Sequence, residues 1–279
     1  KRVGFGVSKC NIGDHVVLHW RESKGIQSQF PKYKSLTKKN ILIGGGLVTT
    51  FNDQAVISEN RITVVPKSIP FNTCALLGCS LTTALGLVNN EAKIKIGQSV
   101  LIFGSGSVGL SLIEACKMIS AYPITVVDIK NKKLYFAKKI GATHTLNYNY
   151  PEFEEKIKKI FGSNGPEVII DTVGNPKIIN TSYSILSKKG KLVLVGQPKH
   201  KKSIILKNAS SNFQGKQVFD SEGGGTIPDI DIPRYVRLID SNKFNFNQII
   251  TNTTSLKNIN KTIRDIRDGK NLGKTLIKF

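Results

Sequence analysis

The sequence lacks any long apolar run. No stretch of about 18 consecutive apolar residues occurs in its 279 residues, so we expect no membrane-spanning helix. The opening Lys1–Gly6 has neither the apolar core nor the cleavage site of a signal peptide. It also has no initiator methionine, since the only methionine is Met118. From this start we expect the natural N-terminus to lie upstream of residue 1.

Cysteine is scarce. Four cysteines are spread along the chain, and no CxxC pair occurs. Cys74 and Cys116 stand among apolar neighbours, which is typical of buried, reduced thiols. This usage excludes a disulfide framework and predicts a cytoplasmic protein.

Acidic residues are few relative to basic ones, at 19 against 41, which gives a net charge of +22. Such a charge is compatible with a nucleic-acid-binding module, which would bind with strong salt dependence. However, lysine outnumbers arginine and is spread along the chain, as an AT-rich genome would produce. The densest patches, Lys188–Lys191 and Lys199–Lys202, contain no aromatic residues for base stacking. We therefore expect a solvated surface and no nucleic-acid partner, with a positive field that attracts an anionic cofactor.

A glycine-rich turn joins a strand to a helix in the middle of the chain. The apolar run Ser99–Phe103 leads into Gly104, Gly106 and Gly109, and helical spacing continues to Ile119. A second apolar run, Ile124–Val127, ends at Asp128. This order of strand, GxGxxG, helix, strand and acid is the pattern of a dinucleotide-binding unit. The glycine hexapeptide alone would also fit a purely structural turn.

Each part of this pattern has a physical role. Gly104 allows the tight turn, Gly106 lets a pyrophosphate approach the backbone, and Gly109 lets the helix lie close to the sheet. The N–H groups of the loop and of the helix N-terminus would face the phosphates. Asp128 would accept hydrogen bonds from the adenine ribose and repel a 2′-phosphate, which favours NAD over NADP.

Strands and helices alternate from Ser99 to Gln197, which predicts a doubly wound parallel sheet of the Rossmann type. After Asp128 we expect helices at 131–140, 151–161 and 176–187 and strands at 143–147, 167–173 and 191–196. Ligands bind at the carboxyl ends of such strands, so Asp128, Thr172–Gly174 and Val195–Gln197 should border one crevice.

The flanking segments have a different texture. We expect short strands at 15–18, 50–58, 61–65, 203–206 and 275–279, a glycine cluster at 223–225 and a helix at 256–267. The Rossmann unit thus interrupts a β-rich domain. The predicted division is residues 1–82 and 223–279 for that domain and residues 83–222 for the nucleotide-binding domain.

Three segments resemble the zinc-dependent medium-chain alcohol dehydrogenases. Gly13-Asp14 opens a strand similar to one in their GroES-like catalytic domain, and Phe51–Pro66 resembles a second conserved stretch. Cys74–Gly86 is the most telling match. The resemblance implies that the β-rich domain is GroES-like and that relatives associate as homodimers or homotetramers.

The resemblance also implies roles for individual residues. Cys79 stands where the family has a catalytic-zinc ligand, and Thr83 stands where a threonine lies against the nicotinamide. The residues implied for the cofactor, beside the three glycines and Asp128, are Ser107 and Val108 at the pyrophosphate, Lys133 at the ribose, Val173, Val195, Gly196 and Gln197 at the nicotinamide, and Lys274 at the pyrophosphate.

Two departures from the family affect zinc. The family's other catalytic-zinc ligands lie upstream of Gly13, where only twelve residues stand here and none supplies them. One ligand cannot form a catalytic zinc site. The four-cysteine structural-zinc lobe is replaced by His19–Ser28, so no structural zinc is expected. In this segment His19, Trp20 and Arg21 either fill the space of the lobe or contact substrate.

The expected function is oxidoreduction of an alcohol and an aldehyde or ketone, with NAD as hydride acceptor and one catalytic zinc in the complete protein. A chain that consists of these 279 residues alone is expected to be inactive, because it lacks the other zinc ligands. Two alternatives remain open: a zinc-independent NAD(P)H reductase of the quinone reductase type, and a non-catalytic NAD-binding protein.

Overall fold

The computed structural model describes residues 1–210, 213–241 and 244–279. At its centre is a six-stranded sheet in which every neighbouring pair is parallel. In sheet order the strands are β10 (Gln217–Asp220), β9 (Lys191–Leu194), β8 (Val168–Asp171), β5 (Val100–Phe103), β6 (Ile124–Asp128) and β7 (His144–Asn147). The chain runs outward from β5 to β7 and then crosses to β8 on the other side of β5. The predicted doubly wound sheet is confirmed, with its switch point between β5 and β8.

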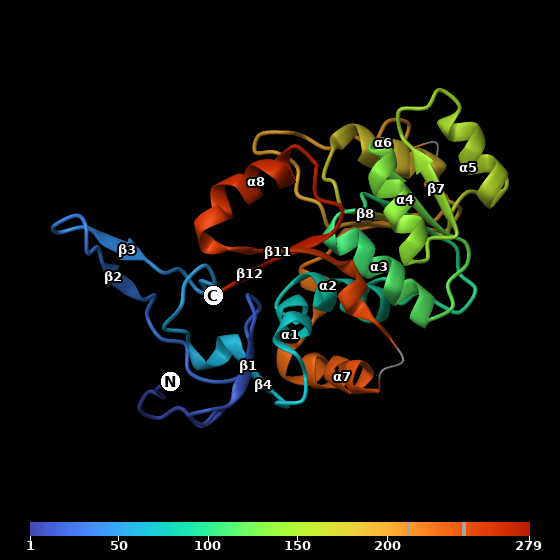
Figure 1. Ribbon diagram of the computed structural model, residues 1–279. Coiled ribbons are helices and arrows are strands. Elements are labelled where there is room, and N and C mark those ends of the chain that lie inside the picture. Colours follow the sequence, from blue (N-terminus) through green and yellow to red (C-terminus); the bar gives the residue numbers. More distant parts are fainter. Residues whose placement is uncertain (211–212, 242–243) are drawn as a thin grey trace.

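Helices cover both faces of this sheet (Figure 1). They are α3 (Ser107–Met118), α4 (Asn131–Ile140), α5 (Phe153–Phe161) and α6 (Pro176–Ile185). Alternate residues of β5 point to opposite faces, as the two-residue period of a strand requires. Val100 and Ile102 join the core beneath α3 and α4, whereas Leu101 and Phe103 join a second core beneath α5 and α6. A strand buried on both faces explains the continuous apolar run in the sequence.

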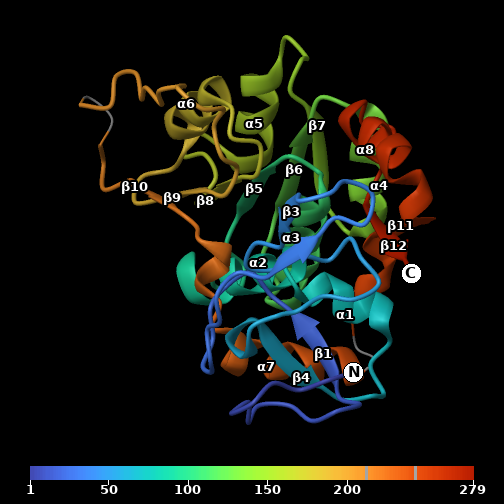
Figure 2. The same ribbon diagram turned by 90° about the vertical axis from the view of Figure 1, so that its left-hand side faces the viewer.

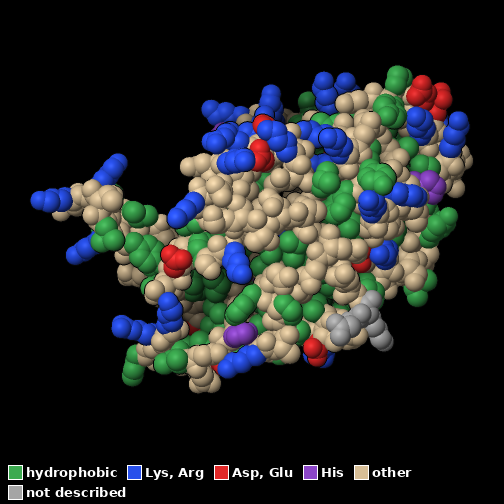
Figure 3. Space-filling model, in the orientation of Figure 1, with side chains coloured by type: hydrophobic (Ala, Val, Ile, Leu, Met, Phe, Trp, Pro, Cys, Tyr) green, Lys and Arg blue, Asp and Glu red, His purple; other side chains and the backbone are tan. Residues whose placement is uncertain are grey.

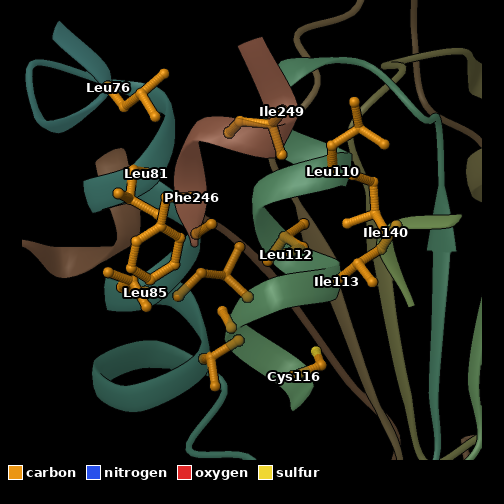
Figure 4. Packing of buried hydrophobic residues seen from close by; sticks show 14 of the residues in the cluster. Leu76, Leu81, Leu85, Leu110, Leu112, Ile113, Cys116, Ile140, Phe246 and Ile249 are labelled. Atoms are coloured by element: carbon orange, nitrogen blue, oxygen red, sulfur yellow. The ribbon is translucent and has the colours of Figure 1, made fainter. Parts of the chain in front are cut away.

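Helix α3 is packed on both of its sides. Its Leu110, Leu112 and Ile113 are fully buried, and the same core continues into α2 (Ser80–Gly86) and the turn η4 (Phe246–Ile249). Figure 4 shows Phe246 between Leu81 and Leu85, and Ile249 beside Leu110. Because α3 connects the sheet to elements from both ends of the chain, these parts share one hydrophobic core.

The remaining elements precede β5 or follow β10 in the chain. They are β1 (His15–Leu18), paired antiparallel with β4 (Ile62–Val65); β2 (Lys32–Lys34), paired antiparallel with β3 (Leu42–Gly44); α1 (Phe71–Leu77); the π-helical turn η2 (Leu87–Glu91); η3 (Gly223–Gly225); α7 (Pro228–Asp240); β11 (Ile250–Ser255), paired parallel with β12 (Lys274–Lys278); and α8 (Ile259–Arg267). The hairpin β2–β3 projects from the body, and Figure 2 views it from its exposed side.

Some local predictions were wrong. Residues 50–58 form no strand; most of this stretch is exposed, and it pairs with no described strand. Residues 203–206 form none either, since the place beside β9 is occupied by β10. Pro151 lies outside α5, which begins at Phe153. The strand expected at 275–279 and the helix expected at 256–267 are present as β12 and as η5 (Leu256–Asn258) followed by α8.

No single helix in the described residues is long and apolar enough to cross a membrane; only the bent pair Phe71–Leu77 and Ser80–Glu91 passes jointly. That pair carries Leu76, Leu77 and Leu81, which are fully buried in the core. The expected domain boundary at 82/83 falls within α2, and the one at 222/223 falls where β10 leads into η3. The division into domains stays a prediction.

Glu114 generates a prediction about stability. Its carboxylate is almost fully buried on α3, where it accepts from Gln248 of η4 and pairs with Lys117 at 3.0 Å. Burial raises the pKa of Glu114 despite these partners. A raised folded-state pKa favours folding at low pH, and this contribution is lost as pH rises through the folded pKa. We expect Glu114→Gln to gain stability relative to the native chain as pH rises from 4 to 8.

Thermal unfolding followed by circular dichroism across that range measures the effect. Glu152→Gln is the control, because Glu152 is exposed and pairs only with Lys156. Its difference from the native chain should stay small at every pH. A Glu114→Gln difference that falls with rising pH would contradict the prediction.

Candidate active site

The glycine loop between β5 and α3 is held by two close approaches, one to a side chain and one to backbone. Gly104 has φ +94°, and a Cβ there would lie 2.4 Å from Oγ1 of Thr172. A Cβ on Gly109 would lie 2.0 Å from the carbonyl oxygen of Gly104. Both positions therefore require glycine, for conformation and space at Gly104 and for helix–strand packing at Gly109.

Gly106 is different, because no atom lies within 4 Å of the place where its Cβ would be. It is the N-cap of α3 and has no side chain to cap the first turn, whose N–H groups lack intrahelical acceptors. Beside it, the buried Oγ of Ser107 has no hydrogen-bond partner among the described residues. Open space, uncapped N–H groups and an unpartnered hydroxyl together form a place suited to an anionic group.

Asp128 stands at the carboxyl end of β6 and faces this loop. Its Oδ2 accepts from the backbone N (2.9 Å) and the Oγ (2.8 Å) of Ser105, and its Oδ1 accepts from the backbone N of Lys130 (3.0 Å). The carboxylate is thus fixed next to the glycine loop. The sequence placed Asp128 here and did not indicate the role of Ser105.

The loops after β8 and β9 lie against each other at the same edge of the sheet. A Cβ on Gly196 would come within 2.3 Å of the backbone N of Gly174. This approach brings Val173, which is 46% exposed, next to Val195, Gly196 and Gln197. The structure therefore gathers the predicted nicotinamide residues into one group.

Asp171 organises both of these loops, and sequence reasoning missed it. Its carboxylate is fully buried and accepts from the backbone N–H groups of Val173 and Gly174. Its own carbonyl accepts from Val195 and Gly196 at 2.8 and 2.9 Å. Burial raises the pKa of Asp171. The available signal was an acid ending an otherwise apolar strand, directly before a glycine.

Cys79 and Thr83 lie at the start of α2. Cys79 is exposed and is the N-cap residue, with its carbonyl accepting from Thr82 and Thr83. Thr83 is buried, and its carbonyl oxygen lies 2.4 Å from the place of a Cβ on Gly224. Because η3 follows the carboxyl end of β10, Thr83 lies at the same carboxyl edge of the sheet as the glycine loop.

The two predicted lysines are held differently. Lys133 lies in the first turn of α4, partly buried, five residues beyond Asp128. Lys274 begins β12, directly after Gly273, whose Cβ would meet the carbonyl of Ile249 at 2.3 Å. Ile249 in turn packs beside Leu110 of α3 (Figure 4). The role of Lys274 at the pyrophosphate stays a prediction.

The segment that replaces the zinc lobe is tied to the glycine cluster of η3. The His19 Nδ1 donates to the carbonyl of Arg21 (2.8 Å), and its Nε2 lies 3.0 Å from the hydroxyl of Thr63. Burial lowers the pKa of His19, which favours the neutral ring. Arg21 donates to the carbonyl of Thr226 and pairs with Glu222. Both ring nitrogens of His19 are therefore engaged in hydrogen bonds.

The donor set for a catalytic zinc is incomplete. A catalytic zinc needs three protein ligands. Among the described residues, no three His, Cys, Asp or Glu side chains are grouped so that they could hold a metal ion. Cys79 is an exposed thiol, and all four cysteines are free. The residues described here do not fit a catalytic zinc.

Comparisons with known proteins agree with this fold. A family model described as zinc-binding dehydrogenase matches residues 107–241. Alcohol dehydrogenase 6 of Peromyscus maniculatus is 28% identical over 295 residues, which cover 96% of this chain and 77% of that protein. The NDMA-dependent alcohol dehydrogenase of Amycolatopsis methanolica is 24% identical, covering 97% of this chain and 79% of that protein.

A solved structure gives the same result. The crystal structure of benzyl alcohol dehydrogenase from Acinetobacter calcoaceticus matches with a TM-score of 0.84 and 27% identity, covering 100% of this chain and 81% of its own. Fold, family model and relatives together define an oxidoreductase of the alcohol dehydrogenase type. The family model, the relatives and the solved structure all support a place in the medium-chain, zinc-type alcohol dehydrogenase family.

The glycine loop yields a paired prediction. Gly106→Ala meets no neighbour and keeps an allowed φ of −79°, so we expect its free energy of unfolding to change by less than about 0.5 kcal/mol. Its new methyl group stands where a pyrophosphate would approach, so we expect NADH affinity to fall at least about tenfold. Gly109→Ala instead meets backbone and should destabilise by about 1–3 kcal/mol or more.

Thermal melting and NADH fluorescence titration on both variants separate the two effects. Loss of stability in Gly106→Ala, or unchanged NADH affinity, would contradict the open character of this position.

Proposed function

We propose that this protein is an NAD-dependent oxidoreductase that interconverts an alcohol and an aldehyde or ketone. The observation that carries the proposal is the open space at Gly106, bordered by the uncapped first turn of α3 and the unpartnered Ser107 hydroxyl, with Asp128 fixed beside it. These groups fit a dinucleotide: N–H donors for the pyrophosphate and a carboxylate for the adenosine ribose. The relatives named above, which are alcohol dehydrogenases, support the substrate class.

Different residues at the sheet edge would bind different parts of the dinucleotide. Ser107 and Val108 would donate to the pyrophosphate, with Lys274 adding positive charge, and Asp128 and Lys133 would hold the ribose. Val173, Val195, Gly196 and Gln197 would line the nicotinamide side, and Thr83 would support the ring from α2. When bound, NAD supplies the hydride-accepting carbon, while the protein orients the reactants and excludes water.

Charge on the surface supports binding of an anionic cofactor. Lys130 donates to the carbonyl of Asp268, which places the end of α8 beside the loop that follows Asp128. Figure 3 shows Lys and Arg side chains gathered over α8, a helix that carries Lys261, Arg264 and Arg267. A positive field of this kind raises the rate at which an anion arrives.

Zinc assistance needs more ligands than Cys79. Cys79 would be one thiolate ligand in the family arrangement, and the described residues supply no group of three around it. We therefore assign no step to zinc. This observation keeps a second candidate, a zinc-independent NAD(P)H reductase of the quinone type. A small-molecule substrate, a cytoplasmic location and a homodimer or homotetramer remain predictions under either candidate.

Three measurements on the purified protein test the proposal: NADH binding by fluorescence, zinc per chain by atomic emission, and alcohol oxidation followed at 340 nm. We expect NADH binding in the micromolar range, as is typical of such cofactor sites. Zinc near one per chain that is lost in Cys79→Ser would support zinc-assisted chemistry. NADH binding without zinc, together with quinone reduction, would favour the second candidate, and absence of NADH binding would overturn the proposal.

A further inference from the structure

We infer that Ser105 is a positioning residue that fixes the Asp128 carboxylate and thereby sets the preference for NAD over NADP. Ser105 is the variable residue between the first two glycines of the loop. The inference rests on the proposed function, since it concerns the same cofactor site. No pattern in the sequence pointed to this residue, because that position of GxGxxG carries no required side chain.

The geometry makes Ser105 a double donor to one oxygen. It is fully buried, and both its backbone N–H and its hydroxyl donate to Oδ2 of Asp128, at 2.9 and 2.8 Å. The backbone N–H of Lys130 donates to Oδ1 at 3.0 Å. An ionised carboxylate has about four acceptor positions. Three are thus occupied, and the remaining one lies on Oδ1.

This arrangement has two consequences for a ligand. The carboxylate is held in one orientation before a cofactor arrives, which removes the entropy cost of ordering it. Its remaining acceptor position suits a ribose hydroxyl, which can donate a hydrogen bond. A 2′-phosphate carries only acceptor oxygens near neutral pH and would face the fixed negative charge.

Two of the nearby donors are already used. The hydroxyl proton of Ser105 and the backbone N–H of Lys130 are both donated to Asp128. The ammonium group of Lys130 donates to the carbonyl of Asp268 and keeps further N–H groups. Lys133, in the first turn of α4, is a second nearby cation. Because both lysines would attract a phosphate, discrimination depends on the fixed position of the Asp128 carboxylate.

The test compares the dissociation constants of NADH and NADPH, measured by fluorescence titration, in a double-mutant cycle of Ser105→Ala and Asp128→Ala. A hydrogen bond to a charged group is lost in Ser105→Ala, so we expect the NADH preference to fall about tenfold. In the Asp128→Ala background, Ser105→Ala should have no further effect on that preference, because Ser105 acts through Asp128.

Ser111→Ala is the matched control. Ser111 is also fully buried, and its hydroxyl donates to the carbonyl of Ser107 on α3 without contacting Asp128. It should keep the native preference. Thermal melting of every variant reports loss of fold separately, and Ser105→Thr, which keeps the hydroxyl, should keep the preference if it folds.

The outcomes separate the two proposals. If the native protein binds NADH and Ser105→Ala keeps its preference, the inference about Ser105 is overturned while the proposed function stands. An equal effect of Ser105→Ala in both Asp128 backgrounds would also overturn it. If the native protein binds neither NADH nor NADPH, the proposed function fails and the inference fails with it.

Discussion

The contact between the first turn of α3 and the end of β5 is the constraint on which the site depends. Helix α3 is buried on both sides, against the sheet and against α2 and η4, so it cannot move away from the strand. Gly109 meets the carbonyl of Gly104 at a distance that admits no side chain. The same packing that forms the core therefore directs the N–H groups of the helix start toward the carboxyl edge of the sheet.

Two aspartates at that edge accept hydrogen bonds from backbone N–H groups. Asp128 binds the glycine loop through Ser105, and Asp171 binds the loops after β8 and β9. In both cases an acid at a strand end accepts N–H groups from loops that have no partners in the sheet. The glycine loop and the loop after β8 are bound by the carboxylates of Asp128 and Asp171, whereas the loop after β9 is bound by the backbone carbonyl of Asp171. These bonds order the loops before any ligand binds. A site built this way is pre-organised on rigid strands.

The segment around His19 is held by hydrogen bonds and an ion pair to other parts of the chain. His19 and Arg21 satisfy their polar groups with Thr63, Thr226 and Glu222, so the segment is fastened to β4 and to the turn after β10. The bond between His19 and Thr63 spans 44 positions, and that between Arg21 and Thr226 spans 205. No local pattern could indicate them, because each partner is a backbone carbonyl or a common side chain. Periodicity in the sequence likewise predicted strands at 50–58 and 203–206 that the fold leaves unpaired.

The sequence by itself determined the alternation of strands and helices in the Rossmann unit, its glycine loop and the acid at the end of β6. It could do so because these features depend on local rules: apolar period, glycine conformation and the spacing of strand, turn and helix. Only the tertiary structure decided that Ser105 holds Asp128 and that Asp171 holds two loops. Those contacts depend on which residues from distant segments come together, and long-range packing alone determines that.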